Sequence, residues 1–176
     1  MAVGNFPKCL KVILKHEGGF VNHPADPGGM TNLGVTKKVY EAWIGHKVSE
    51  DIMRKLTPEL VSPLYKKNYW DALKCDGIPA GLDLCVFDFG VNAGTGRSAR
   101  YLQRLIGAKE DGVIGPATLR SLTFKTVELG TAEMIDRFQE ARRGYYRKLA
   151  TFSTFGRGWL RRVDEVETEA KSMVRK

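Results

Sequence analysis

The chain has 176 residues and a formal net charge of +8, and its 43% hydrophobic and 27% charged residues are typical of a globular protein. This composition excludes an intrinsically disordered chain, and the length allows one domain or a small domain with an appended module. No run approaches the roughly 20 apolar residues that cross a bilayer, and residues 1–8 lack the apolar region of a signal peptide. We therefore expect a protein made in a cytoplasm that does not leave it through a standard signal peptide.

Helices are predicted along most of the chain, because apolar residues recur at three- and four-residue spacing. Thr36 and Thr57 are placed as N-caps, and Pro63 is expected to kink or split the helix in which it lies. Residues 20–36 are rich in Gly, Pro, Asn and Asp and predict turns with a short hairpin at most. The fold class is therefore mainly α, with a small irregular or β-hairpin lobe near the N-terminus. The predicted helices cover residues 6–17, 37–44, 58–70, 82–91, 97–106, a short stretch from 116, 131–152 and 159–170.

The three cysteines, Cys9, Cys75 and Cys85, are an odd number without a CxxC pair. Free cysteine is often buried, so we expect reduced thiols in the core. Only three histidines could join them as metal ligands, and no metal-ligand spacing is present. The sequence therefore predicts neither a metal site nor a cofactor.

Glu17 is the most informative single residue. It follows Ile13 and Leu14 at helical spacing, so it projects from the apolar face of the first helix. Partial removal from water favours the protonated carboxyl group that a glycosidic acid needs, and Gly18-Gly19 leave room for a sugar. The alternative is a helix-terminal glutamate that points into solvent.

Asp26 and Thr31 follow in the turn-rich loop, nine residues after Glu17 and five after Asp26 respectively. Such a loop can place a second carboxylate and a hydroxyl across a cleft from the first. Glycoside hydrolysis uses a pair of carboxyl groups around the scissile bond. Asp26 also belongs to an Asp-Pro-Gly-Gly sequence, which is a good turn by itself.

The run HEGGFVNHPADPGGMTNLGVT at residues 16–36 resembles the signature of glycoside hydrolase family 108. Members of this family are N-acetylmuramidases, found mainly in bacteriophages and bacterial secretion loci. Residues 65–70 (YKKNYW) and 88–94 (DFGVNAG) resemble later blocks of the same family. Residues 111–118 and 158–163 resemble the peptidoglycan-binding segment that usually follows. The resemblance implies a catalytic segment at 1–95 and a peptidoglycan-binding helical segment at 96–176. We predict that they pack as one compact lysozyme-like body, because the alternative, two separable domains, needs a linker and residues 94–96 make a poor one.

The family's catalytic glutamate corresponds to Glu17. By similarity to phage lysozymes, in which the acid ends a helix, Asp26 and Thr31 would position the water or stabilise the oxocarbenium-like state. Asn92 and Asp88, both on the central helix, would bind the glycan, with Asn92 at the end of that helix. Helix capping and termination are the alternatives for these two residues.

Tyr69 and Trp70 could stack on sugar rings, although aromatic residues at helical spacing are more often core.

The implied reaction is hydrolysis of the β-1,4 bond between N-acetylmuramic acid and N-acetylglucosamine. A lytic transglycosylase using Glu17 and a non-catalytic cell-wall binder are the alternatives. Against nucleic-acid binding, the sequence shows no helix-turn-helix, zinc or RNA-binding signature, and its Arg and Lys residues are dispersed along the chain.

The resemblance further implies a phage endolysin that lyses its bacterial host. Such an enzyme would stay in the host cytoplasm until a holin opens the membrane, and it would then act in the periplasm. The basic charge would draw it to anionic peptidoglycan and, from outside, to anionic lipopolysaccharide. We expect a monomer.

Overall fold

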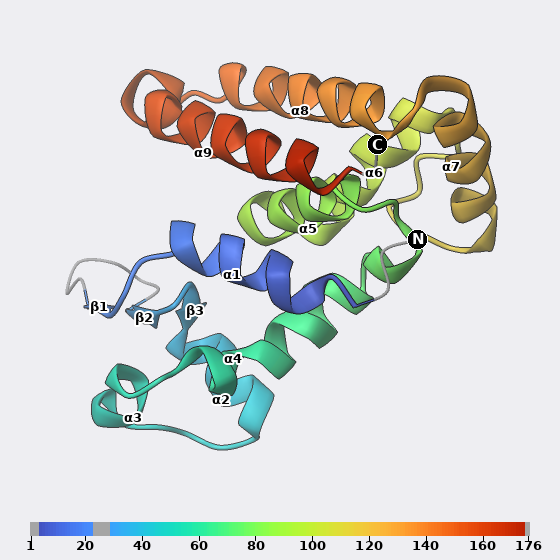
Figure 1. The fold of residues 1–176 in the computed structure, drawn as a ribbon. Helices are drawn as coiled ribbons and strands as arrows, with labels where there is room; N and C mark the ends of the chain where they lie inside the picture. Colours follow the sequence, from blue (N-terminus) through green and yellow to red (C-terminus); the bar gives the residue numbers. More distant parts are fainter. Residues whose placement is uncertain (1–3, 23–28, 175–176) are drawn as a thin grey trace. The chain divides into compact units, whose positions relative to one another are not determined.

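The computed structural model describes residues 4–22 and 29–174. Contacts divide the chain into two compact units, Leu10–Asn68 and Met1–Cys9 with Tyr69–Lys176. The chain passes from one unit to the other within helix α1 (Phe6–His16) and within the π-helix η1 (Lys66–Asp71). Most described residues are helical, which confirms the predicted fold class (Figure 1). In the described ranges, no helix is long and apolar enough to cross a membrane.

The unit formed by residues 10–68 contains a small antiparallel sheet, which confirms the expected β lobe near the N-terminus. Strand β2 lies between the other two, and its Thr31 pairs with Val21 on one side and Thr36 on the other (Figure 1). The elements of this unit besides α1 are β1 (Val21–Asn22), β2 (Met30–Asn32), β3 (Val35–Thr36), α2 (Lys37–Ile44), α3 (Glu50–Arg54) and α4 (Pro58–Tyr65).

The two predicted N-caps are confirmed, because each threonine hydroxyl accepts a hydrogen bond from the third residue of its helix. Thr36 accepts from the Val39 backbone at 3.1 Å, and Thr57 accepts from the Leu60 backbone at 3.3 Å. The expected split at Pro63 is wrong, since α4 runs through this residue into η1. The buried residues Leu64 and Tyr65 follow it, so packing holds the backbone helical beyond the proline.

The second unit is built around α5 (Leu82–Ala93), whose residues 82–90 are all buried. This confirms the predicted central helix. In Figure 1, α8 and α9 lie side by side, and both contact α5. The remaining elements are η2 (Cys75–Gly77), α6 (Thr95–Ile106), α7 (Pro116–Leu129), α8 (Thr131–Arg147) and α9 (Phe152–Met173).

The predicted helix over 131–152 is too long, because α8 ends at Arg147 and Phe152 begins α9. Phe152 turns its ring onto Gly156 one turn later in α9, where a Cβ would come within 2.3 Å of that ring. Phe152 fitted the apolar face of the predicted helix over 131–152, but it packs within the first turn of α9 instead.

Cys9, Cys75 and Cys85 are free and buried, as predicted. Burial raises the pKa of each thiol well above its ordinary value, so the thiols stay protonated at neutral pH.

Candidate active site

Glu17 lies directly after the last residue of α1. Its backbone N–H donates to the Ile13 carbonyl at 3.0 Å, so the helical hydrogen-bond pattern extends to Glu17. Ile13, one turn earlier, is fully buried, and Glu17 itself is half-buried. The spacing that placed Glu17 on the apolar face of the helix therefore brings it to the edge of the core.

The turn between β2 and β3 packs against the segment around Glu17. Its two residues, Leu33 and Gly34, have φ angles of 52° and 78°, as in the tight hairpins that join paired strands. Leucine is rarely found at positive φ, so the surrounding contacts must hold it there. Two hydrogen bonds do so: the Leu33 N–H donates to the Gly18 carbonyl at 3.1 Å, and the Tyr65 hydroxyl donates to the Leu33 carbonyl at 2.8 Å.

Gly34 provides the space that the Glu17 side chain occupies. A Cβ at this position would lie 2.8 Å from Cγ and 3.0 Å from Cδ of Glu17, and 2.5 Å from the Tyr65 hydroxyl oxygen. The carboxyl-bearing end of Glu17 and the phenol of Tyr65 thus meet at the Gly34 α-carbon. Sequence reasoning did not single out Tyr65, although it begins the YKKNYW block that resembles the family.

Gly34→Ala is expected to lower the free energy of unfolding by about 2–4 kcal/mol and to reduce wall-clearing activity. The alanine combines an unfavourable positive φ with displacement of Glu17 and Tyr65. Thermal or urea unfolding and clearing of purified walls measure the two effects. Gly45→Ala is the matched control, because Gly45 also has a positive φ of 87° but its Cβ would meet nothing within 4 Å. Equal losses in both variants would mean that contact with Glu17 is unimportant.

Of the two predicted partners of Glu17, only Thr31 lies in the described part of the chain. Asp26 lies outside the described residues. Thr31 is half-buried at the centre of β2, three residues before Gly34 on the strand that leads into the turn. The roles of both residues remain predictions.

Asp88 is fully buried, and its carboxylate is paired with two guanidinium groups. Its Oδ2 lies 2.7 Å from Nη1 of Arg142, which is also fully buried, and its Oδ1 lies 2.8 Å from Nη2 of Arg162. Burial alone would raise the pKa of Asp88, but the two arginines hold it below its ordinary value. The Asp88 carboxylate thus neutralises the two guanidinium groups and holds them in position.

The predicted stacking residues lie in the second unit. Trp70 is fully buried, packs edge-on against Phe6 and Phe87, and donates its indole N–H to Asp76 at 3.0 Å. This placement corresponds to the core alternative. Tyr69 is half-buried in η1.

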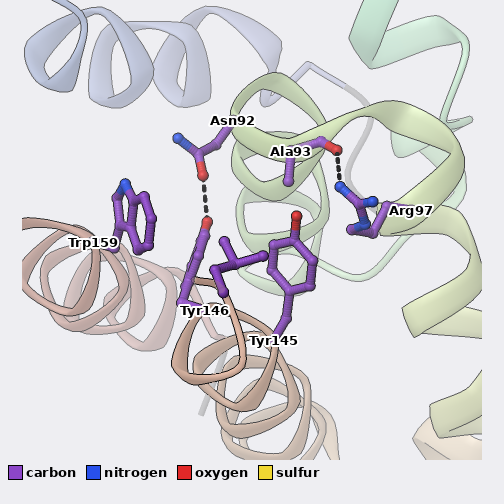
Figure 2. A pocket seen from close by; sticks show the side chains of 7 residues that line it. Asn92, Ala93, Arg97, Tyr145, Tyr146 and Trp159 are labelled. Carbon is purple, nitrogen blue, oxygen red and sulfur yellow. Dashed lines mark hydrogen bonds between the residues drawn. The ribbon is translucent and has the colours of Figure 1, made fainter. Parts of the chain in front are cut away.

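Asn92 is exposed near the end of α5 and lines a surface pocket of about 300 Å³ (Figure 2). Its Oδ1 accepts a hydrogen bond from the Tyr146 hydroxyl. Sequence reasoning did not find the walls formed by α8, the residues after it and α9, because these segments are distant from Asn92 along the chain. The lining residues are Asn92, Ala93, Arg97, Tyr145, Tyr146, Leu149 and Trp159.

Comparison with known proteins identifies the family. The family model described as "Glycosyl hydrolase 108" matches residues 10–94, and the model described as "Predicted Peptidoglycan domain" matches residues 97–164. The solved structure of SagA from Brucella abortus is 38% identical in sequence, with a TM-score of 0.84 over 98% of this chain and 97% of that one. The chain belongs to the glycosyl hydrolase 108 family. No curated protein sequence is similar enough to count as a match.

The family resemblance seen in the sequence is thus confirmed, and this glycosyl hydrolase is an enzyme that acts on peptidoglycan. The half-buried Glu17, the β2–β3 turn and Tyr65 all lie within the region matched by the hydrolase family. Across the described parts of the chain, no three His, Cys, Asp or Glu side chains are grouped as metal ligands would be.

Proposed function

We propose that this glycosyl hydrolase cuts the β-1,4 bond between N-acetylmuramic acid and N-acetylglucosamine, with Glu17 as the proton donor. One observation supports it above all: the Glu17 side chain is held at the end of α1 against Gly34 and Tyr65, in the region that the hydrolase family matches. A glycosidic acid must be partly shielded from water and fixed in direction. The packing around Gly34 supplies both conditions.

In this proposal each group around Glu17 has a defined task. Glu17 gives its proton to the oxygen that leaves the muramic acid anomeric carbon as positive charge develops on the sugar ring. The Leu33–Gly34 turn and Tyr65 limit the positions that the carboxyl group can adopt. Asp26 and Thr31 are proposed to orient the attacking water or to stabilise the oxocarbenium-like state.

Mass analysis of a peptidoglycan digest tests the proposed reaction. Hydrolysis should release fragments that end in a reducing N-acetylmuramic acid. A lytic transglycosylase would leave an anhydro-muramic end, one water lighter. Reducing N-acetylglucosamine ends would mean that the other glycosidic bond is cut. Either of the last two results would contradict the proposal.

We further propose that the enzyme serves as a phage endolysin that lyses the bacterial host. The resemblance to bacteriophage muramidases and the net charge of +8, which suits an anionic wall, support this role. Production inside a Gram-negative host should leave the culture intact until chloroform or a co-produced holin opens the inner membrane, and lysis should then follow. Lysis without any opening of the membrane would contradict holin-dependent release.

A further inference from the structure

The pocket beside Asn92 is built by four helices of the second unit. Asn92 and Ala93 end α5, Arg97 lies in the first turn of α6, and the remaining walls come from α8, the residues that follow it, and α9. Five of its seven lining residues fall within residues 97–164, which match the predicted peptidoglycan domain. The description of this family model gives peptidoglycan as the polymer but gives no binding site. The part of the polymer that the pocket binds must therefore be inferred from the chemistry of its lining residues.

A chain of polar contacts that begins in the core fixes the orientation of the Asn92 amide. Asp88 pairs with Arg142, whose Nε donates to the Tyr146 hydroxyl oxygen at 3.0 Å. The Tyr146 proton is then directed to Asn92, and burial raises the pKa of this phenol, which keeps it a donor. Because Oδ1 of Asn92 is the acceptor, its Nδ2 remains as a donor. In Figure 2, Nδ2 of Asn92 points to the same side as the indole nitrogen of Trp159.

The pocket offers hydrogen-bond donors and a positive charge without any acidic counterpart. No Asp or Glu is among its lining residues. The exposed Arg97 donates one bond to the Ala93 carbonyl at 3.0 Å and stacks 4.5 Å from the Tyr145 ring centre. Within the described chain it has no carboxylate partner. Its remaining N–H groups are free to bind an anionic ligand.

The aromatic walls make this set of donors rigid. Trp159 and Tyr146 are stacked with ring centres 5.4 Å apart and planes 29° apart, and Tyr145 packs edge-on against Tyr146. The faces of these rings are therefore partly occupied by one another and by Arg97. A flat sugar ring would have to compete for them, whereas a small charged group needs only the donors around the pocket.

We propose that this pocket binds a free carboxylate of the peptidoglycan stem peptide. Arg97 supplies the charge, Asn92 adds a neutral donor, and the aromatic walls contact the aliphatic part of the peptide. Stem peptides carry free carboxylates along an otherwise compact chain, which matches a donor-rich pocket of about 300 Å³. The inference rests on the proposed function only in that the ligand comes from the same polymer.

Binding of a synthetic stem tetrapeptide to the full chain tests the proposal. Calorimetry, or tryptophan fluorescence because Trp159 lines the pocket, should show binding. A fully amidated tetrapeptide should bind at least about tenfold more weakly, since it lacks the charge-assisted bond. Arg97→Gln should weaken binding of the free peptide about tenfold as well. Arg100→Gln, an equal change of charge on an exposed residue of α6 outside the pocket lining, should leave it unchanged.

Several results would overturn the proposal. These are equal binding of the amidated peptide, equal losses in the two arginine variants, no detectable peptide binding, and binding of an N-acetylglucosamine tetramer that Arg97→Gln reduces as much. Glu17→Gln should bind the tetrapeptide like the unmodified chain while losing hydrolysis. Failure of the catalytic proposal and failure of this one therefore give different results.

Discussion

Replacing Glu17 with glutamine is expected to reduce peptidoglycan hydrolysis by about a hundred- to ten-thousandfold without unfolding the protein. Glutamine keeps the shape that fits against Gly34 and Tyr65, but its amide cannot give a proton to the leaving sugar oxygen. Release of soluble muropeptides from purified walls measures the rate, and the melting temperature checks the fold.

Glu59→Gln is the matched control for this experiment. Glu59 is exposed in the first turn of α4 in the same unit, so the substitution changes the net charge equally and should leave activity within about twofold. A Glu17→Gln protein that released muropeptides at the unmodified rate would show that the proton donor is another residue. A comparable loss in Glu59→Gln would show that charge, rather than proton donation, governs the rate.

Asp88→Asn is expected to lower the free energy of unfolding at neutral pH by about 3–5 kcal/mol. The substitution leaves the fully buried Arg142 and the nearly buried Arg162 without their shared negative charge. Urea unfolding at pH 7 measures the effect. Asp164→Asn is the control, because Asp164 is 66% exposed in its pair with Arg143 and should contribute less than about 1 kcal/mol.

The dependence of this effect on pH follows from the depressed pKa of Asp88. A carboxyl group with a lower pKa in the folded than in the unfolded chain stabilises the fold above its unfolded pKa of about 4. This stabilisation is lost as the pH falls through the folded value. The difference between Asp88→Asn and the unmodified protein should therefore shrink below about pH 4. A difference at pH 7 as small as that of Asp164→Asn would contradict the assigned role of the ion pairs.

Residues close together in the chain explain most of what was predictable. Thr36 and Thr57 cap their helices because a cap needs only its own side chain and a backbone N–H three residues on. Glu17 lies at a helix end on the apolar side because helical spacing fixes its direction relative to Ile13. The central helix was predictable because most of its residues 82–90 are apolar. The family motif added the type of chemistry.

Two of the wrong predictions, at Pro63 and at Phe152, concern places where packing overrides local preference. Nothing within one turn of Pro63 indicates that α4 continues beyond it, and Phe152 fits the apolar pattern of either helix. The environment of Trp70 likewise depends on Phe6 and Phe87, which are distant in the sequence.

By itself the sequence determined most of the helices, the two threonine caps, the family and the position of Glu17 at the end of α1, since all of these depend on neighbours within a turn or on a contiguous motif. Only the tertiary structure decided that Gly34 and Tyr65 meet the Glu17 side chain, and that the buried Asp88 is paired with two arginines, one of which donates to Tyr146. The reason is that close approach between distant segments depends on how whole elements pack, and spacing along the chain carries no information about which faces meet.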